Sequence, residues 1–198
     1  MNKVKIISMQ FIAAALMLIS LTAQAGMQEA NEALAAKDYT AALKELQPLA
    51  TKGDAAAQFQ LGELYDQGTG VPLDEKKALS WYRKAAVQGY AQAQYMLGIM
   101  YENSAGVPLD YKKAMSWYRK AAEQGAPDAQ SALGAMYAAG LGVKANMVQA
   151  LKWFILAAST GYEIGQINVK EVEPLMSKKQ VEQARALAQQ WQKSHTKK

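Results

Sequence analysis

Apolar and small residues recur along this chain at a spacing of 36 residues. Leu61, Leu97 and Leu133 each stand directly before a glycine and four residues before a tyrosine. A fixed period of this size is typical of stacked repeats, in which each unit buries its apolar face only against its neighbours. The pattern predicts three full repeats, over residues 54–89, 90–125 and 126–161.

Each repeat is predicted to form two helices joined by a glycine-rich loop. In the first helix, Ala57, Leu61 and Tyr65 recur every four residues and share one face. A glycine beside Leu61 costs about 1 kcal/mol of helix propensity relative to alanine, so a neighbouring helix is predicted to pass too close for a side chain. We interpret the repeated motif residues as scaffold: Leu61, Gly62, Tyr65, Trp81, Leu97, Gly98, Tyr101, Trp117, Leu133, Gly134, Tyr137 and Trp153.

The loops carry signals for helix ends and helix starts. Asp74, Asp110 and Asn146 occupy equivalent positions where a short side-chain oxygen can cap the second helix of each repeat. Glycines at 68 and 140 end the first helix in two repeats, whereas Ser104 stands at the equivalent position of the middle repeat. The serine predicts a turn that is strained or differently shaped.

Degenerate repeats are expected at both ends of the array. Residues 26–53 predict an N-terminal helical hairpin, and residues 162–192 predict C-terminal capping helices, followed by a disordered basic tail at 193–198. In the third repeat, Ile155 and Leu156 replace charged residues and need a cover. The predicted cover is the apolar stripe of the last helix: Val181, Ala184, Leu187, Ala188 and Trp191.

The N-terminus has the pattern of a signal peptide over residues 1–25. Two lysines precede an apolar run, and small residues at Ala23 and Ala25 predict cleavage after Ala25. The alternative is an uncleaved membrane anchor, although the run is short of a comfortable span of about 20 residues. We expect a periplasmic or secreted mature chain with no stable membrane insertion after cleavage.

Composition narrows the possible functions. The net charge is +5, but the excess lies at the two ends, and residues 26–192 carry 17 basic and 17 acidic residues. This distribution does not predict a nucleic-acid partner. The chain has no cysteine and one histidine, His195, so no metal or other cofactor is predicted. No nucleophile, base and acid set is evident either, and we expect a protein that is not an enzyme.

The complete motif, with its A-x-x-x-LG-x-x-Y, G-x-GV and WY-x-x-AA-x-x-G segments, resembles the SEL-like repeat family of the tetratricopeptide-like superfamily. The resemblance implies an all-α fold, an α-solenoid of stacked antiparallel helix pairs. It also implies a scaffold or adaptor for other proteins, found often among exported bacterial proteins. Some exported relatives carry a disulfide in each repeat, which this cysteine-free chain lacks.

If the motif is scaffold, a partner should contact the positions that differ between repeats. On the first helices these positions form one stripe, which lines the concave groove in tetratricopeptide-like solenoids. The predicted partner-binding groove consists of Phe59, Glu63, Asp66, Tyr95, Ile99, Glu102, Ser131, Ala135 and Ala138. The functional hypothesis is a monomeric adaptor that binds a protein or peptide there. The alternatives are that these positions are merely solvated, that the protein is a self-associating envelope component, or that it is a hydrolase of cell-envelope material.

Overall fold

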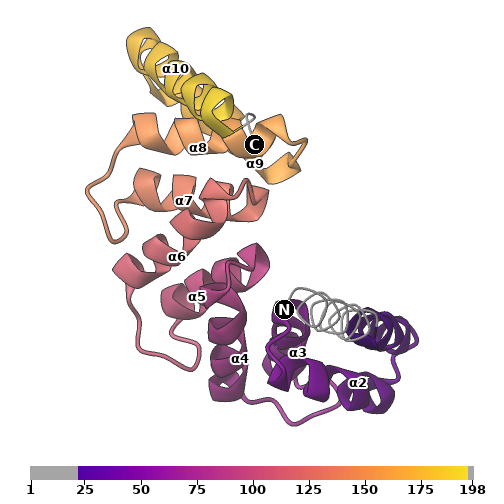
Figure 1. Cartoon of the computed structure of the whole chain (residues 1–198). Coiled ribbons are helices and arrows are strands. Elements are labelled where there is room, and N and C mark those ends of the chain that lie inside the picture. The colour runs from indigo at the N-terminus through magenta and orange to yellow at the C-terminus, as the bar shows by residue number, and fades with distance from the viewer. Residues whose placement is uncertain (1–21, 196–198) are drawn as a thin grey trace, which may run out of the picture. The chain divides into compact units, whose positions relative to one another are not determined.

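The computed structural model describes residues 22–195, and this part of the chain is helical without strands (Figure 1). The predicted all-α solenoid of stacked antiparallel helix pairs is confirmed. The charged and apolar parts of the predicted signal peptide, residues 1–21, and the tail residues 196–198 lie outside the described residues. The helices are residues 22–35, α2 (Tyr39–Thr51), α3 (Ala55–Gln67), α4 (Glu75–Val87), α5 (Ala91–Asn103), α6 (Tyr111–Glu123), α7 (Pro127–Ala139), α8 (Met147–Ser159), α9 (Glu163–Val172), the short 3₁₀ helix η1 (Glu173–Leu175) and α10 (Lys178–His195).

The chain forms two compact units, and the boundary falls within α4, between Trp81 and Tyr82. In the first unit, α2 and α3 pack together over a core that includes Ala42, Leu46 and Leu61. Asp38 and Asp54 cap these two helices, since their carboxylates accept from the backbone N–H of Ala41 and Ala57 at 3.0 and 2.8 Å.

The second unit is built from the pairs α5–α6 and α7–α8, followed by α9 and α10 (Figure 1). Leu97 and Leu133 of the repeated motif are fully buried. Gln94 and Gln130 are buried as well, and each donates its side-chain N–H to a backbone carbonyl at the end of the preceding helix, Ala86 at 3.0 Å and Ala122 at 3.1 Å. The repeated Ala-Gln pair therefore joins one repeat to the next.

In the second and third repeats, the glycine beside the motif leucine makes room for an aromatic ring. A Cβ at Gly98 would lie 2.3 Å from Cε1 of Tyr118, and a Cβ at Gly134 would lie 2.6 Å from Cε1 of Phe154. The prediction of close approach by a neighbouring helix is right in outcome, but at Gly98 the nearest group is a side chain of α6 and not its backbone. In the second and third repeats, the aromatic residue after the motif tryptophan therefore requires a glycine on the preceding helix.

The predicted caps of the second helices are present. Asp74, Asp110 and Asn146 each accept from the backbone N–H three residues on, at 2.9, 3.0 and 3.1 Å. The backbone hydrogen bonds lower the pKa of the Asp74 and Asp110 carboxyls below their usual range, with further help from Lys77 and Lys113. The start of each second helix is therefore set by one short polar side chain.

Ser104 adopts the left-handed backbone conformation that its repeat equivalents reach as glycines. Its φ is 59°, beside 63° at Gly68 and 73° at Gly140. A non-glycine residue pays a steric cost there, which the bond from the Ser104 hydroxyl to the carbonyl of Val107, at 3.1 Å, offsets in part.

We predict that Ser104→Gly raises the free energy of unfolding by about 0.5–1 kcal/mol, because it removes the Cβ from a left-handed site. The free energy of unfolding is measured by urea denaturation, and hydrogen exchange of amides in the second unit reports where the change occurs. Gly140→Ser is the matched control and should lower the stability, since it places the same side chain at φ 73°. A Ser104→Gly variant no more stable than the parent would show that the serine turn is unstrained.

The C-terminal helix covers the apolar positions of the third repeat. α10 packs against α8, and Leu156, Trp153 and Ala188 belong to one buried cluster. Trp191 meets Trp153 edge-on at a centroid distance of 6.1 Å. The sequence placed the end of this helix at residue 192, whereas α10 continues to His195, whose ring stacks on Trp191 at 3.9 Å. In the described part of the chain, no helix is long and apolar enough to span a membrane.

Candidate functional site

In the first unit, the predicted groove residues lie along α3. Phe59, Glu63 and Asp66 are all half-buried. Burial, and secondly the charge of Asp66, raises the pKa of the Glu63 carboxyl above its usual range. Next to this stripe, the amide of Gln60 donates to the side-chain oxygen of Asn31 at 2.7 Å. α3 therefore presents one aromatic ring and two carboxylates that repel each other.

In the second unit, Tyr95, Ile99 and Glu102 follow one another along α5 and are half-buried. The ring of Tyr95 lies 5.6 Å from the ring of Tyr118, which is buried and comes from α6. The Tyr118 hydroxyl donates to Oε2 of Glu102 at 2.6 Å. Burial raises the pKa of Tyr118, and the carboxylate raises it further, so this bond holds Glu102 in a fixed position while the tyrosine stays protonated.

The three predicted groove residues of α7 differ in their access to solvent. Ser131 is only 6% exposed, and its hydroxyl oxygen accepts from the Asn168 side chain of α9 at 2.9 Å. Ala135 is exposed and Ala138 is half-buried. Because α9 covers Ser131, this residue is not available to a partner. The solvent-accessible part of the predicted groove on α7 therefore begins at Ala135.

Two further residues complete this face, and neither is among the predicted groove residues. Asp128 lies in the first turn of α7, and its carboxylate acts on Tyr162, the residue before α9. Burial raises the pKa of Tyr162, and Asp128 raises it further. Burial also raises the pKa of Tyr95, followed by the charges of Asp128 and Glu102. Two carboxylates from different helices thus act on the same phenol.

A signal for Asp128 is present in the sequence. It precedes Ser131 by three residues, so extending the predicted stripe by one helical turn towards the N-terminus of α7 reaches it. Tyr162 has no such signal. It stands directly before a helix, as Tyr90 and Ala126 do in the earlier repeats, and none of these three side chains caps its helix.

The comparisons with known proteins agree with this architecture. The family model of the Sel1 repeat matches residues 55–90, 91–125 and 127–162, which is more than half of the chain. The chain belongs to the Sel1 repeat family. The resemblance to SEL-like repeat proteins seen in the sequence is therefore confirmed. Proteins with Sel1 repeats are generally scaffolds for protein interactions.

Two solved structures are similar to this Sel1 repeat chain. A Sel1 repeat protein from Oxalobacter formigenes is 37% identical, with a TM-score of 0.68, over 71% of this chain and 58% of that one. The protein c5321, a protective antigen of uropathogenic Escherichia coli with an SLR fold, is 32% identical, with a TM-score of 0.59, over 78% of this chain and 41% of that one. The chain thus spans less than two thirds of either protein. The comparison with curated proteins gives no match.

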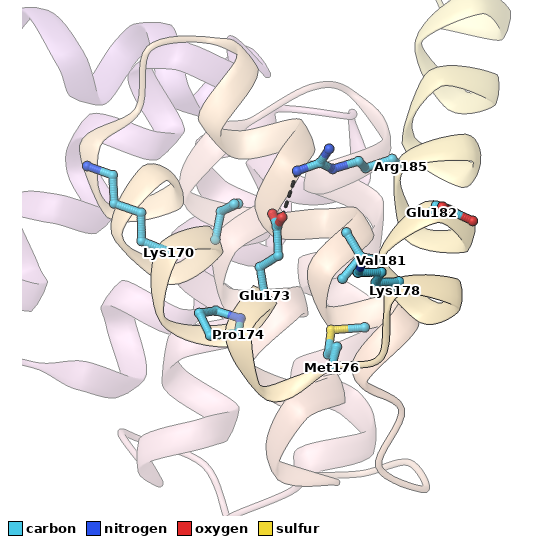
Figure 2. Close-up of a pocket in the computed structure, with 9 residues that line it drawn as sticks. Lys170, Glu173, Pro174, Met176, Lys178, Val181, Glu182 and Arg185 are labelled. Carbon is cyan, nitrogen blue, oxygen red and sulfur yellow. Dashed lines mark hydrogen bonds and ion pairs between the residues drawn. The ribbon is translucent and has the colours of Figure 1, made fainter.

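The C-terminal cap of the Sel1 repeats contains a cavity of about 620 Å³ that sequence reasoning missed (Figure 2). Figure 2 shows Arg185 reaching from α10 to Glu173, and these two side chains form an ion pair at 2.7 Å. Val169, Met176 and Val181 supply apolar lining. The charged lining residues have both signs, so the cavity has no clear preference for one charge of ligand.

Metal chemistry gains no support from the described residues. Within residues 22–195, no group of three or more histidine, cysteine, aspartate or glutamate side chains is placed to hold a metal ion. Sel1 repeat folds are typically non-enzymatic scaffolds. The aromatic and acidic face of α5 and α7 is therefore the candidate site.

Proposed function

We propose that this chain is a non-enzymatic scaffold or adaptor that binds a protein or peptide on the first helices of its Sel1 repeats. The observation that carries the proposal is the face of the second unit, where the half-buried ring of Tyr95 lies beside two carboxylates, Glu102, which Tyr118 holds by a hydrogen bond, and Asp128. Rigid aromatic anchors beside oriented polar groups are typical of protein-binding surfaces.

The scaffold around this face is held by contacts within the chain. The motif leucines are buried, Asp110 caps its helix, and the side-chain N–H groups of Gln94 and Gln130 donate to backbone carbonyls. The stripe, in contrast, changes from repeat to repeat and keeps half-buried and exposed side chains. These differences support recognition of one particular partner on a common framework.

We also propose that the chain is exported to the periplasm or beyond and cleaved after Ala25, on the basis of the charged, apolar and small-residue segments at its start. The intact mass of the protein recovered from cells tests this part, because cleavage leaves Gly26 as the first residue. A recovered chain that still carries the apolar segment would overturn it.

Capture from extracts of the native cells, separated into envelope and cytosolic fractions, tests the scaffold function. Ala135→Arg places a bulky cation on the exposed part of the stripe, whereas Ser116→Arg makes the same change on α6. We expect a protein partner that is retained by the parent and by Ser116→Arg and lost by Ala135→Arg. Equal capture by all three proteins would place binding elsewhere, and oligomers that form on concentration without a partner would favour self-association.

A further inference from the structure

The two carboxylates of the candidate face have tyrosines as neighbours and not cations. Tyr118 donates to Glu102 at 2.6 Å, and the charge of Asp128 raises the pKa of Tyr162 beyond the effect of burial. Within residues 22–195, neither carboxylate has a lysine or arginine at ion-pair distance, unlike Asp74, Asp110 and Glu173. A carboxylate accepts about four hydrogen bonds, so Glu102 keeps free acceptor positions beside its bond from Tyr118.

The carboxylates of Asp128 and Glu102 make the electrostatic potential around Tyr95 negative. Its phenol is half-buried, and its pKa is raised by burial and by the charges of both Asp128 and Glu102. A half-buried site bordered by two carboxylates favours a positive charge. Ile99 lies one turn further along α5, between Tyr95 and Glu102, and adds an apolar contact for a hydrocarbon stem.

Lysine side chains lie over other tyrosine and tryptophan rings of this chain. Lys77 lies over Tyr65 at 5.1 Å, and Lys113 lies over Tyr101 at 5.3 Å. Lysines also lie 4.0 Å from the tryptophan rings at 117 and 153. In the described part of the chain Tyr95 has no such cation, although the charges of Asp128 and Glu102 act on it.

We propose that this face receives a cationic side chain of a partner peptide, arginine in preference to lysine, seated against Tyr95 between the carboxylates of Glu102 and Asp128. The inference rests on the proposed function, since it names the chemistry of the partner that the groove binds. Arginine fits because its planar guanidinium stacks on aromatic rings and donates to two carboxylates at once. Its alkyl stem can lie along Ile99.

Selection of a phage-displayed library of random 12-residue peptides on the purified protein tests the inference. We expect enriched peptides to share an arginine beside an apolar residue, and a synthetic copy to bind in calorimetry. The double variant Glu102→Gln with Asp128→Asn keeps an acceptor for the Tyr118 hydroxyl and removes both charges. It should weaken binding about tenfold or more, because charge-assisted hydrogen bonds are lost.

A second double variant controls for net charge. Glu123→Gln with Glu182→Gln removes the same two charges from exposed positions on α6 and α10, and binding should change less than about twofold, as for other exposed charges. Peptides without basic residues that still require an unblocked Ala135 would overturn the cation and leave the groove standing. If no peptide is enriched, or if the enriched peptides bind Ala135→Arg equally well, both the cation and the groove are overturned. If instead the parent forms a dimer that the first double variant dissociates, the partner on this face is a second copy of the chain and not a peptide.

Discussion

Gly98→Ala should destabilise the second unit by about 1–3 kcal/mol, although alanine is the better helix former by about 1 kcal/mol. The added Cβ would lie 2.3, 2.4 and 2.9 Å from three ring atoms of Tyr118. That ring is 1% exposed and its hydroxyl is held by Glu102, so it cannot swing away without losing its packing and its hydrogen bond. Urea unfolding and hydrogen exchange of α5 and α6 measure the loss.

The cause can be isolated in a double-mutant cycle. Tyr118→Leu shortens the side chain opposite Gly98, and in that background Gly98→Ala should be neutral or stabilising, because only the gain in helix propensity remains. A Gly98→Ala variant as stable as the parent would show that the ring relaxes freely. In that case the repeated glycine would need another explanation than the aromatic residue of the next helix.

The repeat framework could be predicted from the sequence because each feature is local and appears three times. Caps such as Asp110 act on a backbone group three residues away, and the apolar spacing fixes which face of each helix is buried. Ser104 was identified as unusual only because glycines occupy the same position in the other repeats. Its positive φ confirms that the turn keeps its shape and that the serine adapts to it.

The candidate site depends on contacts that do not recur with the 36-residue repeat. Tyr118 belongs to the repeated WY-x-x-AA segment and not to the predicted groove, yet its hydroxyl donates to Glu102 from 16 residues away. Ser131 was predicted to face the groove, but Asn168 of the degenerate last repeat buries it. Asp128 acts on Tyr162, which stands directly before α9 in the degenerate last repeat. Irregular ends of the array thus shape the face, and only the structure shows how.

Ala188→Glu should release α10 from α8. Ala188 is 1% exposed and belongs to the same buried cluster as Trp153 and Leu156. A carboxylate there has no cation within the cluster, and burying an unpaired charge costs several kcal/mol. Detachment of the helix is cheaper than burial of the charge, so we expect faster hydrogen exchange along α10 and binding of an apolar fluorescent dye to the exposed face of α8.

Ala186→Glu separates this effect from helix propensity and net charge. It makes the same substitution on the same helix, at an exposed position, and should leave hydrogen exchange and dye binding as in the parent. Protection of α10 retained in Ala188→Glu would mean that the helix stays bound despite the charge. The difference between the two variants measures how strongly α10 covers the third repeat. Without α10, Ile155 and Leu156 offer an apolar surface to another chain. Release of α10 should therefore also promote association, visible as larger species in light scattering.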